Sequence, residues 1–172
     1  MKLSYIIPIA ACLVGMASCG KDDGPKADKQ LIIAQQYMPV SMTFDSTDEA
    51  IMQKCRDWNR KVVVVNSNDQ LPDDPIGFSA SFQHLNLQYQ TLLLAYRMQV
   101  WNVESYTNTF IRSYSENCYK WTVSTGICDF FDEEDTTRNF TRYAILVSKI
   151  PDGADVKMYW NESISGWDWD WD

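Results

Sequence analysis

Apolar and polar side chains alternate over much of the chain, and this period of two residues predicts β-strands. Strands are expected at residues 31–44, 61–65, 91–103, 107–114, 118–123, 140–150 and 156–160. The valine run at 61–65 and the stretch 140–150 are apolar on both faces, which predicts strands covered on two sides, the second of them central. Pro39 is expected at a sheet edge or a bulge, because it cannot donate to a ladder.

One segment has the period of a helix instead. Three apolar residues fall on one helical face: Ile51, Cys55 and Trp58. Ser46, with Glu49 three residues later, has the pattern of a capping box. A helix is therefore predicted over about residues 47–58. The expected fold class is mainly β: a single antiparallel β-sandwich or twisted sheet with this helix packed on it.

The N-terminal residues have the pattern of an export signal. Lys2 precedes an apolar run, residues 5–14, which is shorter than the roughly 20 residues that a membrane-spanning helix needs. The small residues Ala17 and Ser18 stand directly before Cys19. This pattern resembles the lipobox of bacterial lipoproteins and implies cleavage before Cys19, with lipid on its thiol and amino group. An ordinary secretory signal, with Cys19 as a plain thiol, is the alternative.

The next residues indicate a more specific location. Lys21-Asp22-Asp23 resembles the export signal of Bacteroidetes surface lipoproteins, which implies an outer-membrane, surface-exposed location with the membrane as a partner through the lipid anchor. The predicted organisation is a signal peptide at 1–18, a lipidated flexible tether at 19–29 and a single β-rich domain at 30–172.

Charge argues against one class of partner. Losing the signal removes one of 15 basic residues and none of the 23 acidic ones, so the net charge moves from −8 to −9. Binding to nucleic acid requires a basic surface, so no nucleic-acid partner is expected.

Few residues are candidates for chemistry. His84 is the only histidine, and no nucleophile motif accompanies it, so it is expected to be structural or on the surface. Three cysteines remain in the predicted domain, as buried thiols or with two of them bridged, and the former is preferred: Cys55, Cys118 and Cys128. The acidic run 132–135 is expected to be an exposed loop, with a calcium site as the less favoured alternative. No enzyme activity, cofactor or metal site is predicted.

Part of the domain resembles a known family. Residues 61–69, a turn-rich segment and then 85–94 together resemble the small β-rich domains of the protease-complex-subunit (PrcB-like) group, which are related in shape to chagasin-type protease inhibitors. The resemblance covers about residues 61–150 and implies a β-rich fold, but its Gly-Gly-Tyr segment is missing here. It transfers no functional residues.

The C-terminal tail is the most distinctive stretch. Three tryptophans alternate with aspartates and would share one face of a strand: Trp167, Trp169 and Trp171. They suit either a closing strand or an aromatic platform for a sugar or peptide. The leading hypothesis is a non-enzymatic binding module at the cell surface, with an unidentified protein or glycan ligand. The alternatives are a protease-inhibitor-like domain, with loops at 103–107 and 124–126, and a small hydrolase that uses two carboxylates.

Overall fold

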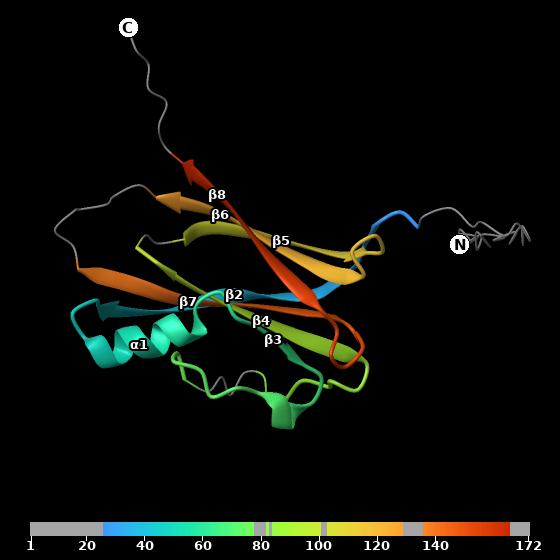
Figure 1. Cartoon of the computed structure of the whole chain (residues 1–172), viewed down its shortest axis with the longest axis horizontal. Coiled ribbons are helices and arrows are strands. Elements are labelled where there is room, and N and C mark those ends of the chain that lie inside the picture. Colours follow the sequence, from blue (N-terminus) through green and yellow to red (C-terminus); the bar gives the residue numbers. More distant parts are fainter. Residues whose placement is uncertain (1–25, 78–81, 83, 101–102, 129–135, 166–172) are drawn as a thin grey trace, which may run out of the picture.

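The computed structural model describes residues 26–77, 82, 84–100, 103–128 and 136–165, with the backbone alone at 127, 128, 164 and 165. Its strands form two four-stranded sheets that face each other as a β-sandwich (Figure 1). Sheet A has the order β1 (Lys29–Gln30), β5 (Val103–Ser113), β6 (Cys118–Cys128) and β8 (Val156–Ser165). Sheet B has the order β2 (Ile33–Asp45), β7 (Thr137–Ser148), β4 (Gln90–Gln99) and β3 (Val62–Val65). The predicted fold class is confirmed.

Sheet B is the middle of three layers. Sheet A covers one of its faces, and helix α1 (Glu49–Trp58) together with the connection between β3 and β4 covers the other (Figure 1). Because both faces are covered, β4 and β7 send alternate residues into two separate cores. On β4, Leu93 belongs to the inner core between the sheets, and Leu94 belongs to the outer core beneath α1. The predicted central strand is confirmed, since β7 lies between β2 and β4.

The expected proline irregularity is also confirmed. β2 is an edge strand of sheet B, and its register with β7 shifts between Tyr37 and Val40, so that Met38 and Pro39 lie in a bulge. The valine strand β3 is the opposite edge, yet both of its faces are covered. Val62 and Val64 pack on the inner core, whereas Val63 and Val65 pack on the outer one.

Helix α1 begins later than predicted. Its N-cap is Asp48, whose side chain accepts hydrogen bonds from the Ala50 and Ile51 backbone amides at 3.2 and 3.1 Å. The expected Ser46 cap is wrong, because the Ser46 amide donates to the Thr136 carbonyl and the residue therefore still belongs to the end of β2 and its turn.

The buried stripe of α1 also differs from the expectation. Met52 and Cys55 are buried, Trp58 lies with its ring 4.9 Å from that of Tyr96, and Ile51 is 36% exposed. Ile51 was therefore the wrong core residue, because the contact follows a spacing of three residues and places Met52 against the sheet. Within the described residues, no helix is long and apolar enough to cross a membrane.

One strand pair has an orientation that the alternation does not specify. β6 and β8 run parallel, in register from Tyr119 and Val156 to Cys128 and Ser165, whereas the other described pairs are antiparallel. β8 follows β7 in the chain but crosses to the other sheet. The predicted turn at Pro151-Asp152-Gly153 makes this possible, with Gly153 at a φ of 71° and the Ala154 amide donating to the Pro151 carbonyl.

Candidate functional site

The two ends of the sandwich differ. β1, the first described strand, pairs with the last residues of β5, at Ile111 and Arg112. The opposite end, which we call the open end, is where β2, β4, β6 and β8 finish and where β5 and β7 begin (Figure 1). The described chain therefore starts at one end of the sandwich and leaves it at the other.

The core between the sheets changes from apolar to polar toward the open end. Five residues from β4, β6 and β7 occupy its polar part, and all but the first are buried: Arg97, Gln99, Thr125, Asn139 and Thr141. Ser41 shares a 2.8 Å hydrogen bond with Thr141, and the Thr43 hydroxyl donates to Asn139 at 2.7 Å. A cluster of polar residues between sheets is unusual in a sandwich, whose inner faces normally supply apolar side chains.

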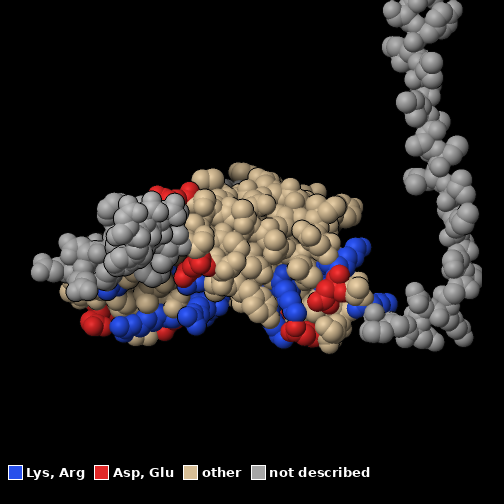
Figure 2. All heavy atoms as spheres, turned by 90° about the horizontal axis from the view of Figure 1, so that it is seen from above, with Lys and Arg blue, Asp and Glu red and all other residues tan. Residues whose placement is uncertain are grey.

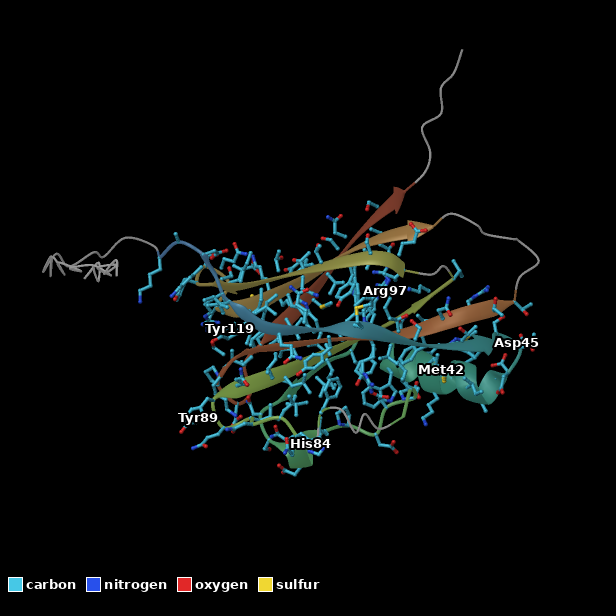
Figure 3. All side chains as sticks on the ribbon, turned by 180° about the vertical axis from the view of Figure 1, so that it is seen from behind. Met42, Asp45, His84, Tyr89, Arg97 and Tyr119 are labelled. Carbon is cyan, nitrogen blue, oxygen red and sulfur yellow. The ribbon has the colours of Figure 1, made fainter. Side chains whose placement is uncertain are left out.

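A charged group of side chains marks the β8 side of this polar region. Arg97 forms an ion pair with Glu162, and its guanidinium carbon lies 4.8 Å from the centre of the Trp160 ring. The ring of Tyr143 meets the same tryptophan edge-on at 5.1 Å. Figure 3 shows Arg97 between the two sheets, near the end of the sandwich that carries Asp45.

Tyr143 is the least satisfied polar residue of this group. It is 1% exposed, and its hydroxyl has no hydrogen-bond partner among the described residues. Burial raises the pKa of Tyr143 to about 12, an effect that the Arg97 cation and the Gln99 amide oppose in part. Gln99 is close enough to act on the phenol electrostatically, but its amide nitrogen is directed to Thr141 at 3.5 Å.

A cleft opens between the two sheets on the β2 side of the open end. We call it the edge cleft; it has a volume of about 380 Å³ and is lined by Met38, Pro39, Ser41, Val103, Glu104, Ser105 and Tyr106. Tyr106 closes its inner end, because its hydroxyl donates to the Tyr37 carbonyl at 2.9 Å and lies 3.7 Å from the Met38 sulfur. The cleft therefore lies at the free sheet edge, between β2 and the start of β5.

The outer face of sheet A carries uncharged polar groups in rows. Thr109, Thr122 and Tyr159 lie side by side on three strands, and Thr107, Ser124 and Asn161 form the next row, a set that we call the hydroxyl face. Across the described chain, none of these six side chains takes part in a hydrogen bond to the protein. Figure 2, which views the molecule from this side, shows charged residues gathered along one rim and a broad area without them.

A second buried polar group has a structural role. Asp74 accepts hydrogen bonds from the Tyr96 hydroxyl and from Arg142, both at 2.7 Å, and Arg142 also donates to the Gly77 carbonyl at 3.2 Å. These side chains are at most 5% exposed. Burial, followed by the hydrogen bond to Asp74, raises the pKa of Tyr96 strongly. The group ties the connection between β3 and β4 to sheet B.

Several sequence-predicted residues can now be placed. His84 is exposed on the connection beside sheet B, as expected (Figure 3). Cys55 and Cys118 are buried free thiols, and Cys128 ends β6 with its side chain outside the described set. Cys19, the acidic run 132–135 and the tail with Trp167, Trp169 and Trp171 lie outside the described residues. No three His, Cys, Asp or Glu side chains within the described ranges are grouped to hold a metal ion.

Each of the two alternative functions predicts a structural feature that can be compared with the fold. The segments 103–107 and 124–126, expected as projecting loops of an inhibitor, lie side by side but as paired strands within β5 and β6. The expected loops are wrong, because the two segments pair with each other as strands. For a two-carboxylate hydrolase, the buried carboxylate among the described residues is Asp74, and Arg142 and Tyr96 already occupy it.

Sequence reasoning missed the edge cleft and Asp74. Met38 and Tyr106 are far apart in the chain, and the signal that could have indicated the cleft is the uncharged stretch around Pro39. Comparisons of the chain with models of protein families, with curated proteins and with solved structures gave no match. Functional conclusions therefore depend on the residues and geometry described above.

Proposed function

We propose that this protein is a lipid-anchored binding module of the outer membrane, displayed at the cell surface by acylated Cys19 and acting without catalysis. The lipobox-like pattern before Cys19 and the Lys21-Asp22-Asp23 signal support the anchor. The ten residues between Cys19 and Gln30 could extend over roughly 30 Å at about 3.3 Å per residue. An anchored N-terminus would leave the open end of the sandwich directed away from the bilayer.

The observation that carries this proposal is the edge cleft. A cleft of about 380 Å³ beside an unpaired strand edge offers both volume and backbone hydrogen-bonding groups to a partner. It lies at the end of the molecule that would face outward. The partner would be a protein segment or another extended molecule from outside the cell.

Metabolic labelling with palmitate tests the anchor. The wild-type chain should incorporate label, whereas Cys19→Ala should incorporate none and should leave the membrane fraction. Cys12→Ala is the matched control, because its thiol lies within the predicted signal and its loss should leave labelling unchanged. Label retained by Cys19→Ala, or absent from the wild type, would overturn the proposed anchoring. Protease treatment of intact cells then tests surface display, since a displayed domain is digested without lysis.

A second candidate ligand is a neutral glycan on the hydroxyl face. Its six unpaired polar side chains supply donors and acceptors without charge, and Tyr159, 42% exposed, supplies an aromatic surface. A glycan array would compare the wild type with Thr109→Val/Thr122→Val and with a variant in which Trp167, Trp169 and Trp171 are alanine. Loss of signal in the first variant assigns the face, and loss in the second assigns the tail.

A further inference from the structure

Strand β2 carries the usual protection of a sheet edge only at its bulge. Natural edge strands generally carry charges, prolines, bulges, short lengths or covering elements that prevent another strand from pairing with them, and β2 has the bulge with Pro39. β2 has 13 residues, and the chain has no charged residue between Lys29 and Asp45. Two apolar side chains of β2 are nevertheless exposed, Met38 at 76% and Val40 at 45%. In Figure 3 β2 crosses the front of the molecule, with no described element drawn over it.

The two halves of this edge differ. In the first half, the Asn108 side-chain amide donates to the Gln36 side-chain oxygen at 3.0 Å and the Tyr106 hydroxyl donates to the Tyr37 carbonyl, so β5 already occupies that part. After the bulge, the segment Val40–Asp45 is in regular register with β7 on one side. β7 is its one neighbour in the described sheet. Its six residues would extend over about 20 Å, enough to pair with a short strand.

The edge cleft lies beside the bulge and the start of this second half. Met38, Pro39 and Ser41 of β2 form one wall, and the opposite wall includes Val103 and Tyr106 of β5. In strand addition, main-chain hydrogen bonds give affinity, while pockets beside the edge accept alternate side chains and give specificity. β2 offers both an unpaired strand edge and a cleft within a few residues of each other.

We propose that residues Val40–Asp45 bind an extended, uncharged peptide segment of another protein as an additional strand of sheet B, with one apolar side chain of that segment in the edge cleft. This inference deepens the proposed function, on which it rests for the origin of the peptide outside the cell. The stretch between Lys29 and Asp45 offers no counter-ion to a charged side chain. The acidic groups nearby, Asp45 at the end of the segment and Glu104 on the cleft wall, would disfavour an acidic peptide.

A short peptide fits this edge better than a second copy of the chain. Two copies related by a two-fold axis would bring β2 against β2, and the bulges at Met38 and Pro39 would limit the shared ladder to Val40–Asp45 of each copy, with an Asp45 carboxylate at both ends. The β5 contacts at Gln36 and Tyr37 would also obstruct the first half of each strand. A peptide of five or six residues would pair with β2 without needing the bulge or the first half of the strand.

Peptide binding to the full-length chain in detergent tests the proposal. The probes are an array of uncharged decapeptides that alternate threonine with valine, leucine or phenylalanine, and fluorescent copies of those that bind. The full-length wild type should bind a subset, and N-methylation of alternate peptide amides should lower affinity at least tenfold. Methylation on one edge of the peptide removes the donors that a strand needs, while the side chains stay in place.

Variants of the protein localise the site. Met38→Lys/Val40→Lys should lower affinity at least tenfold, and both side chains are exposed enough for the fold to tolerate the change. Tyr89→Lys is the matched control, since Tyr89 is 69% exposed, lies away from β2 and should leave affinity unchanged. Unchanged circular dichroism in all three proteins would show that folding is intact.

Three outcomes would overturn the inference. They are an array without binders, equal binding of the N-methylated peptides, and equal loss of binding in the Tyr89→Lys control. Concentration-dependent dimerisation in sedimentation experiments, abolished by Met38→Lys/Val40→Lys, would assign the edge to a second copy instead. Because binding is measured on the purified chain, a negative result here is distinguishable from failure of Cys19 to acquire lipid, which the palmitate experiment measures separately.

Discussion

Asp74 and Arg142, 68 residues apart in the chain, form a 2.7 Å ion pair beneath the connection that precedes β4. The same carboxylate oxygen accepts the Tyr96 hydroxyl, and the other accepts the Ile76 backbone amide at 3.0 Å. A buried charge of this kind is tolerated because its partners replace the lost water. The pair fastens a turn-rich segment to the middle of sheet B.

Removing one partner of this pair should be costly. Asp74→Ala leaves the Arg142 charge buried without its counter-ion, so we expect the free energy of unfolding to fall by about 3–5 kcal/mol. Urea titration followed by tryptophan fluorescence measures it. Asp73→Ala, at the exposed neighbouring position, should change stability by less than about 0.5 kcal/mol. Equal effects of the two substitutions would contradict a structural role for the pair.

Tyr143 should make stability fall at alkaline pH. Its pKa is raised to about 12 by burial, whereas an unfolded tyrosine titrates near 10, so the unfolded chain loses the proton first as the pH rises. The corresponding stability is present in full below pH 10 or so and is lost toward pH 12. Between these values the wild type should lose about 2 kcal/mol more than Tyr143→Phe. Parallel urea-derived stabilities across this range would contradict the shift.

The same substitution tests the unpaired hydroxyl at neutral pH. Because the Tyr143 hydroxyl is buried and has no hydrogen-bond partner among the described residues, its removal costs no hydrogen bond there. Tyr143→Phe should therefore keep or raise the free energy of unfolding at pH 7. Tyr96→Phe is the comparison, since it breaks the bond to Asp74 and should lower stability by about 1–3 kcal/mol. A loss of that size in Tyr143→Phe would reveal a partner for its hydroxyl.

The start of α1 can be tested by two alanine substitutions. Asp48→Ala removes a side chain that accepts two backbone amides, and we expect a loss of about 1 kcal/mol. Ser46→Ala should have little effect, because Ser46 precedes the cap and its backbone amide remains bonded to Thr136. Thermal unfolding of the two variants measures the difference, and a larger shift for Ser46→Ala would restore the capping-box interpretation.

The buried thiols should react slowly. Burial raises the pKa of Cys55, and Cys55 and Cys118 both lie in the interior as free thiols. Iodoacetamide should label their peptides in urea but hardly at all in the native protein, because both thiols are buried from the reagent and the reactive thiolate of Cys55 is also disfavoured. Peptide mass mapping measures both. Rapid native labelling of Cys55 would show that α1 opens readily.

The sequence alone predicted the central strand correctly. It did not predict which strands pair with each other or which distant side chains meet. Residues around Ile145 and Leu146 are apolar on both faces, and only a strand covered from two sides suits that pattern. Pro39 likewise had few permissible positions in a sheet. Local chemistry determines such features, so a single sequence reveals them.

Long-range pairing could not be read in the same way. Asp74 stands between prolines in what looks like an exposed turn, and its burial depends on Arg142 from a distant strand. The parallel arrangement of β6 and β8 and the meeting of Met38 with Tyr106 in the edge cleft depend equally on topology. Alternation shows which side of a strand is apolar, but it does not show which strand lies next to it.

The described chain starts at one end of the sandwich and finishes at the other, and this arrangement has a mechanical consequence. A pull between the start of the described chain and a partner held on β2 at the open end would act nearly along β2, which is paired with β7 from Ile33 to Asp45. Ladder hydrogen bonds lie across that direction, so many of them would share the load and would have to break together. A tethered domain of this design would resist shear from flowing liquid better than one pulled open from a single edge.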